Sequence, residues 1–93
     1  MKIYQQASAP ELQIMLEKRN YWLRIHNHKL LCKTQKSNPS KMIDGGISEI
    51  LSYYDEHIKY LCTMHRVITQ DGKIIQEDVK DVYLDGIWYK TTD

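Results

Sequence analysis

The side chains that could hold a metal ion fall into two groups along the chain. His26, His28 and Cys32 form the first group, and Cys62 with His65 forms the second. Imidazole nitrogens and thiolates are the ligands that zinc prefers, but structural sites bring four of them together. On a strand Cys62 and His65 would point to opposite faces. The spacing therefore favours buried thiols and solvated histidines, and we predict no metal site and no cofactor.

Nucleophilic catalysis and anion binding find little support in the sequence. No serine, cysteine and histidine form a nucleophile signature, and no glycine-rich loop opens a helix. Residues 44–46, Asp-Gly-Gly, could hold an anion on free backbone N–H groups ahead of a helix, but such a tripeptide is more typical of a plain loop. We therefore predict no enzymatic activity and no catalytic residues.

Ribonuclease activity is an alternative that depends on the predicted order of elements. A strand, two helices and three antiparallel strands follow one another, and this order resembles the RelE/ParE-type toxins of toxin–antitoxin modules. The resemblance implies a cleft on the sheet that binds and polarises a phosphodiester, with His65, Arg66, Lys80 and Tyr83 as candidates here. Arg66, His65 and Lys80 are better explained as cross-strand partners of Glu77, Asp78 and Thr63. The chain also ends in Lys-Thr-Thr-Asp, without that family's basic or aromatic ending.

The charges are unevenly distributed, although the formal net charge is only +1. Seven basic residues and no acidic residue lie between Lys18 and Ile43, whereas ten acids and five bases follow from Asp44 onward. This asymmetry predicts a basic surface that binds an acidic protein partner. The predicted partner-binding residues are the cations and aromatic residues of this segment and one later tryptophan: Arg19, Trp22, Arg24, His26, His28, Lys29, Lys33, Lys36, Lys41 and Trp88. Nucleic acid stacking on the same segment is the alternative, although a pI near 7.8 is low for such a module.

Length and composition predict one domain spanning residues 1–93, with a single core. The first residues lack a secretory signal and no stretch reaches membrane-spanning length, so we expect a cytoplasmic protein with no membrane partner. Two cysteines are too few for a disulfide framework, which favours buried thiols and leaves a single Cys32–Cys62 disulfide open. A domain this small also leaves a homodimer open.

Local patterns predict two helices. Ser8, Pro10 and Glu11 form a capping box with proline in the first turn, after a short strand at residues 3–4. Residues 47–58 carry apolar side chains at helical spacing and predict the second helix. Residues 21–33 fit either a helix or a strand, and their aromatic and branched residues favour a strand or hairpin. Residues 34–46 read as a surface loop.

The last third predicts a three-stranded antiparallel meander with two-residue turns at residues 71–72 and 85–86, both Asp-Gly. These turns define the cross-strand pairs Ile68–Ile75, Met64–Val79, Tyr60–Tyr83, Arg66–Glu77, Lys80–Thr63, Tyr83–Trp88, Val82–Tyr89 and Asp81–Lys90. The register places Tyr60, Tyr83 and Trp88 on the face that carries Cys62, Met64 and Val79, opposite Leu61, Val67, Val82 and Tyr89.

The resulting expectation is an α+β fold in which two short helices pack on a C-terminal three-stranded antiparallel β-meander, with an additional strand or hairpin from residues 21–33 left open. Function is expected to be that of a small non-enzymatic protein-binding or inhibitory domain that covers a partner's surface. Phage inhibitors, toxin-neutralising proteins and immunity proteins work in this way.

Overall fold

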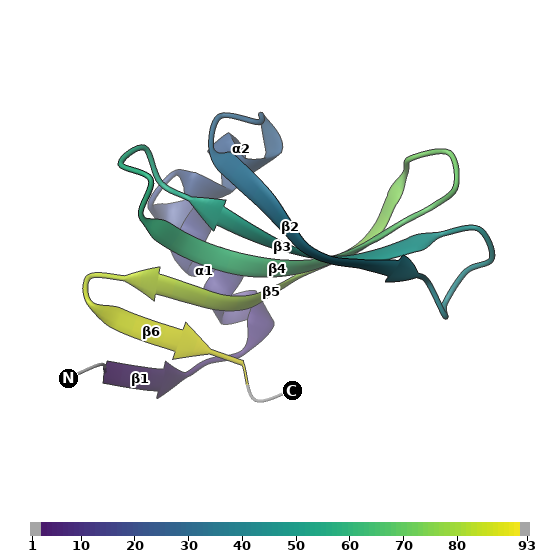
Figure 1. The fold of residues 1–93 in the computed structure, drawn as a ribbon. Helices are drawn as coiled ribbons and strands as arrows, with labels where there is room; N and C mark the ends of the chain where they lie inside the picture. Colours follow the sequence, from purple (N-terminus) through teal and green to yellow (C-terminus); the bar gives the residue numbers. More distant parts are fainter. Residues whose placement is uncertain (1–2, 92–93) are drawn as a thin grey trace.

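The structure, a computed structural model, describes residues 3–91. Six strands form one sheet in the order β1-β6-β5-β4-β3-β2, in which β1 runs parallel to β6 and all other neighbours are antiparallel (Figure 1). The elements in chain order are β1 (Ile3–Gln6), α1 (Ala9–Lys18), α2 (Tyr21–His26), β2 (Leu31–Pro39), β3 (Ile47–Tyr54), β4 (Tyr60–Ile68), β5 (Ile74–Leu84) and β6 (Ile87–Lys90). Neither of the two helices between residues 3 and 91 is long and apolar enough to span a membrane.

Both helices cover the same face of the sheet, over one half of its length (Figure 1). Leu12 and Leu16 of α1 are fully buried, and Ile25 of α2 is 3% exposed. They pack against alternate side chains of the central strands: Leu51, Tyr53, Cys62, Met64, Val79 and Val82. We call this side the helix-covered face and the opposite side the open face. The hairpin tips on the other half of the sheet extend beyond the helices.

The predicted start of the first helix is confirmed. Ser8 caps α1 by accepting a hydrogen bond from the Glu11 backbone N–H, and the Glu11 carboxylate accepts from the Ser8 N–H. These two bonds satisfy donors that the first turn of a helix leaves without partners. The Ser8 hydroxyl also donates to the Glu11 carboxylate at 2.9 Å, and this bond, followed by the one from the Ser8 N–H, lowers the pKa of Glu11.

The predicted fold class was wrong, because the sheet has six strands and mixed direction rather than three antiparallel strands. Residues 47–58, predicted as a helix, form β3 and the loop after it. β3 lies between two strands, and Leu51, Ser52 and Tyr53 are all buried. Its two neighbouring strands bury even the polar Ser52, so β3 shows no clean alternation, and its apolar residues matched the spacing of a helix.

Residues 21–33 were favoured as a strand or hairpin, and this prediction was wrong for most of the segment. Residues 21–26 form the one-and-a-half-turn helix α2, and residues 31–39, mostly predicted as loop, form β2. Asn20 has a φ of 62°, a left-handed conformation that ends α1 and redirects the chain into α2. β2 is an edge strand whose nine residues are all exposed. It therefore carries lysine, serine and asparagine side chains, which resemble those of a loop, and the strand was not predicted.

The first Asp-Gly turn is longer than predicted. Thr69 donates to the Lys73 carbonyl at 2.8 Å, which leaves three residues in the loop, and Gly72 adopts a φ of 88°. A three-residue loop with a left-handed glycine is a common hairpin connection. It pairs Ile68 with Ile74 instead of Ile75. The predicted register was therefore wrong next to this turn.

Two bulges on β5 then shift the β4–β5 register by one residue each. Met64–Val79 and Arg66–Glu77 pair as predicted, but Thr63 pairs with Asp81 because Lys80 bulges out. The N–H and hydroxyl of Thr91 donate to the Lys80 carbonyl at 3.1 and 3.2 Å, which satisfies it.

The bulges overturn the predicted division of the sheet into faces. Val82 and Tyr89 belong to the helix-covered core, together with Cys62, Met64 and Val79. Tyr60, Tyr83 and Trp88 do share a face, but it is the open one.

The second Asp-Gly turn has the predicted form. Asp85 and Gly86 have φ values of 53° and 79°, the two left-handed residues that a type I′ turn requires. Leu84 pairs with Ile87 across it, and the predicted pair Tyr83–Trp88 is present. Two-residue primed turns match the twist of the flanking strands, which is why this register could be predicted from the sequence.

Candidate binding surfaces

Arg19, Arg24 and His26, in the first half of the basic segment (residues 18–26), are paired with acids within the molecule. Arg19 at the end of α1 pairs with Asp85 of the β5–β6 turn. Arg24 of α2 pairs with Glu56 at 3.0 Å and lies over the Tyr21 ring, 4.6 Å from its centroid. Acidic residues of the C-terminal half thus form ion pairs with basic residues of the helices. Folding therefore partly cancels the uneven distribution of charge along the sequence.

His26 is the third member of this neutralised group. Its Nε2 lies 2.6 Å from the Glu77 carboxylate on β5, and its Nδ1 lies 2.8 Å from the Trp22 carbonyl. Partial burial disfavours the charged imidazolium, but these two acceptors outweigh burial, so the pKa of His26 is raised. Trp22 lies against the His26 ring at 4.6 Å and packs against the core, so both residues support α2.

The second half of the basic segment, residues 29–41, keeps its charge. Lys29, Lys33, Lys36 and Lys41 form no ion pair with any residue between positions 3 and 91. Lys33 and Lys36 lie on β2, which forms one edge of the sheet, and the other two lysines lie in the loops at its ends. A bulge between Thr34 and Lys36 shifts the register, so both strand lysines project on the open face despite their odd spacing.

An aromatic row crosses the open face from β1 to β3. Its members are Tyr4, Trp88, Tyr83, Tyr60 and Tyr54. Trp88 lies at the centre, with ring centroids 5.9 Å from Tyr4, 5.7 Å from Tyr83 and 5.6 Å from Tyr60. Such spacings are typical of favourable aromatic pairs.

A lysine lies at each end of the aromatic row. The Lys90 Nζ is 4.9 Å from the Trp88 ring centroid and 5.0 Å from that of Tyr4. The Lys33 Nζ is 5.5 Å from the ring centroid of Tyr54. All three distances fall within the range of a cation–π contact. The row therefore connects the positive charge of β6 with that of the edge strand β2.

A hydrogen-bonded group lies beneath the row. The Tyr60 hydroxyl donates to the Asp81 carboxylate and contacts the Thr63 hydroxyl. Burial is the main reason that the pKa of Tyr60 is raised, and the bond to Asp81 raises it further. The phenol therefore stays protonated at neutral pH and remains a donor, which fixes the Tyr60 ring at the centre of the row.

The two potential metal-ligand groups do not converge. Among the residues that the structure describes, no three histidine, cysteine or acidic side chains are placed to hold a metal ion. His26 faces Glu77 on the helix-covered side, whereas His65 bonds the Ser48 hydroxyl at 2.8 Å on the open face.

The two thiols are free, and only one of them is buried as predicted. Cys32 is exposed, which corrects the reading of both cysteines as buried, and burial raises the pKa of Cys62. Both pair with Tyr53 from opposite sides, so two strand spacings, roughly 9–10 Å, separate them. This exceeds the reach of a disulfide.

The residues proposed for a ribonuclease cleft are also dispersed. Arg66 lies on the helix-covered face, 3.0 Å from Glu49, whereas its neighbour His65 projects on the open face. Tyr83 belongs to the aromatic row and Lys80 occupies the β5 bulge. Because Arg66 and His65 project on opposite faces, the four side chains do not line one face of the sheet.

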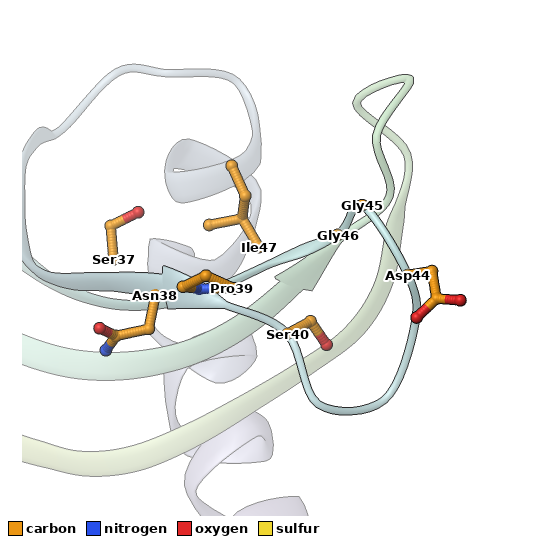
Figure 2. A pocket seen from close by; sticks show the side chains of 8 residues that line it. All are labelled: Ser37, Asn38, Pro39, Ser40, Asp44, Gly45, Gly46 and Ile47. Atoms are coloured by element: carbon orange, nitrogen blue, oxygen red, sulfur yellow. The ribbon is translucent and has the colours of Figure 1, made fainter.

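The loop between β2 and β3 encloses a hollow of about 550 Å³ (Figure 2). It includes the Asp-Gly-Gly tripeptide, which precedes a strand and not a helix. Gly46 is buried, and a Cβ there would lie 2.9 Å from the Ile68 carbonyl oxygen, so glycine allows the loop to pack on β4. Figure 2 shows the Asp44 carboxylate pointing away from Ser37 and Asn38. The polar groups do not converge on a ligand.

Sequence reasoning identified Trp88 and the β2 lysines as candidates and placed Tyr60 and Tyr83 on one face with Trp88, but it missed Tyr4 and Tyr54. Tyr4 is aligned by the parallel pairing of β1 with β6, between the two ends of the chain, and Tyr54 by the pairing of β3 with β4. The predicted Tyr83–Trp88 pair was the signal that pointed toward the row. No family model, curated protein or solved structure matches the chain, so fold and surface chemistry carry the functional argument.

Proposed function

We propose that the protein is a small, non-enzymatic binding domain that captures an acidic, extended segment of a protein partner along the open edge of β2. The observation that carries this proposal is the coincidence of an unpaired edge strand with unneutralised lysines. Nine consecutive residues of β2 are exposed, and Lys33 and Lys36 have no acidic partner among residues 3–91. Lys29 and Lys41 extend the positive charge beyond both ends of the strand.

The edge strand offers two kinds of recognition to such a segment. Backbone N–H and C=O groups that point away from β3 can hydrogen bond to an added strand, independent of its sequence. Side chains opposite Lys33 and Lys36 then decide specificity, because opposite charges directly across a strand pair attract and like charges repel. An acidic strand therefore fits this edge, and a basic one does not.

A second copy of this chain is the weaker candidate for the added strand. Pairing β2 with β2 of another copy would bring both sets of lysines to one sheet, and no acid lies between Lys18 and Ile43 to offset them. The repulsion would be felt along the whole edge. We therefore favour a different, acidic chain as the partner.

The simpler interpretation is that these lysines prevent the edge strand from pairing with other sheets. Lysine, proline and a bulge on an edge strand are devices that prevent sheets from associating, and β2 has all three. The two readings make different predictions for charge reversal. If the lysines recognise a partner, reversal abolishes capture, and if they only prevent association, capture is unaffected.

The test compares two doubly substituted chains in affinity capture. Lys33→Glu with Lys36→Glu should lose the captured acidic partner, whereas Lys18→Glu with Lys73→Glu, which makes the same net charge change on α1 and the β4–β5 turn, should retain it. In the complex, amide hydrogen exchange should slow along residues 31–39 and change less elsewhere. Equal capture by both variants, or protection confined to other strands, would overturn the proposal.

A further inference from the structure

We infer that the open face also carries a nucleotide-binding site, in which a base stacks on Tyr83 and meets Trp88 edge to face while a phosphate lies near Lys59. The site is a shallow hollow of about 380 Å³ lined by Lys59, Tyr60, Tyr83 and Trp88. The hollow lies away from the outer edge of β2. Tests of nucleotide binding and tests of the proposed protein partner can therefore give independent results.

The walls of the hollow are three aromatic rings on three neighbouring strands. Tyr83 and Trp88 meet nearly edge to face, with an interplanar angle of 82° and centroids 5.7 Å apart. The Tyr60 ring centroid lies 5.6 Å from that of Trp88, and the Tyr60 hydroxyl is already bonded to Asp81. Tyr83 is 39% exposed, so a planar ligand can reach the ring surfaces. A flat ring buried here would gain stacking area without displacing a protein hydrogen bond.

The positive charge at the rim of the hollow determines which ligands with a flat ring fit it best. Lys59 contributes to the hollow directly, and Lys90 lies over the far side of Trp88. Lys59 forms no ion pair with another residue in the described range 3–91. Aromatic cages usually bind ammonium groups, but two lysines repel a cation. An anionic ligand with a flat ring, such as a nucleotide, satisfies both the rings and the charge.

The loop before β4 holds Lys59 in place. Asp55 accepts hydrogen bonds from the backbone N–H groups of His57 and Lys59 at 2.8 and 2.9 Å, and its own N–H donates to the Lys59 carbonyl. Ile58 takes a φ of 61° to close this turn. These contacts fix the backbone of Lys59 beside Tyr60, so its side chain starts from a defined position at the rim.

A neutral sugar fits the hollow less well. Sugars also stack on tyrosine and tryptophan, but they need several donors and acceptors around the ring to satisfy their hydroxyl groups. The lining here offers Lys59 and the Tyr83 hydroxyl, and the Tyr60 hydroxyl already donates to Asp81. Hydroxyl groups buried without partners would cost binding free energy.

The probes are uridine and adenosine monophosphates, followed by ligand-observed saturation-transfer NMR, and a fluorescently labelled single-stranded RNA ten-mer, followed by anisotropy. We expect both kinds of probe to bind, with base protons of the monophosphates receiving the saturation. Comparable affinities would identify a free nucleotide as the ligand, and much tighter binding of the ten-mer would identify single-stranded RNA. Either result supports a nucleotide site. No saturation of base protons together with no change in anisotropy would overturn it.

Three substitutions separate stacking from general electrostatics. Tyr83→Leu keeps an apolar side chain but removes the ring, and Lys59→Glu reverses the rim charge, so each should weaken binding about tenfold or more. Lys73→Glu, on the β4–β5 turn, makes the same charge change away from the hollow and should have little effect. Equal weakening by Lys59→Glu and Lys73→Glu, or unchanged binding in Tyr83→Leu, would exclude the site. Binding of glucose as tight as that of the nucleotides would exclude it as well.

Discussion

The two faces of the sheet are built from alternate residues of the same strands, yet they have different compositions. The helix-covered face buries aliphatic side chains such as Leu51, Met64 and Val79 against α1 and α2. The open face exposes tyrosines and a tryptophan, supported by a polar group around Tyr60. One face therefore holds the fold together, and the other is free to interact.

This division teaches that a small domain can place stability and recognition back to back on one sheet. Hydrophobic stabilisation scales with the apolar area removed from water, and the helices remove it from only one face. Aromatic residues tolerate partial exposure better than aliphatic ones, since they gain from each other and from nearby lysines. The comparison predicts that substitutions on the helix-covered face mainly change stability, whereas those on the open face mainly change binding.

The largest expected effect comes from Leu16→Ala. Leu16 is fully buried between α1 and the sheet, so truncation leaves a cavity and should lower the free energy of unfolding by about 2–5 kcal/mol. Tyr4→Ala on the open face, where the ring is 53% exposed, should cost clearly less. Chemical denaturation of both variants measures the difference. Similar losses would show that the open face stabilises the fold as much as the core does.

A smaller effect is expected for Tyr60→Phe, which removes a single hydroxyl from the open face. Asp81 loses a donor and Thr63 loses a partner, so the free energy of unfolding should fall by about 1–2 kcal/mol. Tyr83→Phe serves as the control because the hydrogen bonds of this group join Tyr60, Thr63 and Asp81, and the Tyr83 ring is partly exposed. If the two variants are equally stable, the polar group beneath the row contributes nothing.

Much of the local chemistry could be predicted from the sequence, whereas the sheet as a whole could not. The capping box at Ser8 and the turn at Asp85 depend on neighbouring residues, and both were correct. β3 was misread because its burial comes from the strands beside it. The parallel pairing of β1 with β6 joins the two ends of the chain, and no local pattern signals such a contact.

The candidate surfaces show the same limit. The lysines of β2 and Trp88 were named from composition, but composition could not separate Lys33 and Lys36 from Arg24, which pairs with Glu56. To tell a free lysine from a paired arginine, one must know where the acidic residues lie in the fold, and Glu56 is more than thirty residues away from Arg24 in the sequence. The bulge at Lys80 likewise moved Tyr83 to the face opposite Val79, and bulges have no reliable signature in a single sequence.

The pH dependence of stability tests a contact on the rim of the helix-covered face. His26 has a raised pKa in the folded state because Trp22 and Glu77 outweigh its burial. The contribution of the imidazolium to stability is therefore complete below its unfolded pKa of about 6.5 and is lost as pH rises through the folded pKa. The free-energy difference between the wild type and His26→Gln should be larger at pH 5.5 than at pH 8.5, by under about 1 kcal/mol. His28→Gln is the control, and a difference that grows with pH would contradict the pairing.

The smallest effect is expected at the pair between Arg19 and Asp85, which belongs to neither face. Both side chains are largely exposed, at 49% and 63%, and water screens such pairs strongly. The hydrogen bond between them raises the pKa of Arg19 and lowers that of Asp85, so both stay charged near neutral pH. Arg19→Gln and Asp85→Asn, alone and combined, should leave the denaturation midpoint unchanged at physiological salt. A coupling between them that persists at high salt would show that this rim pair fixes α1 to the β5–β6 turn. Arg19 would then be a structural residue and no longer a candidate for partner binding.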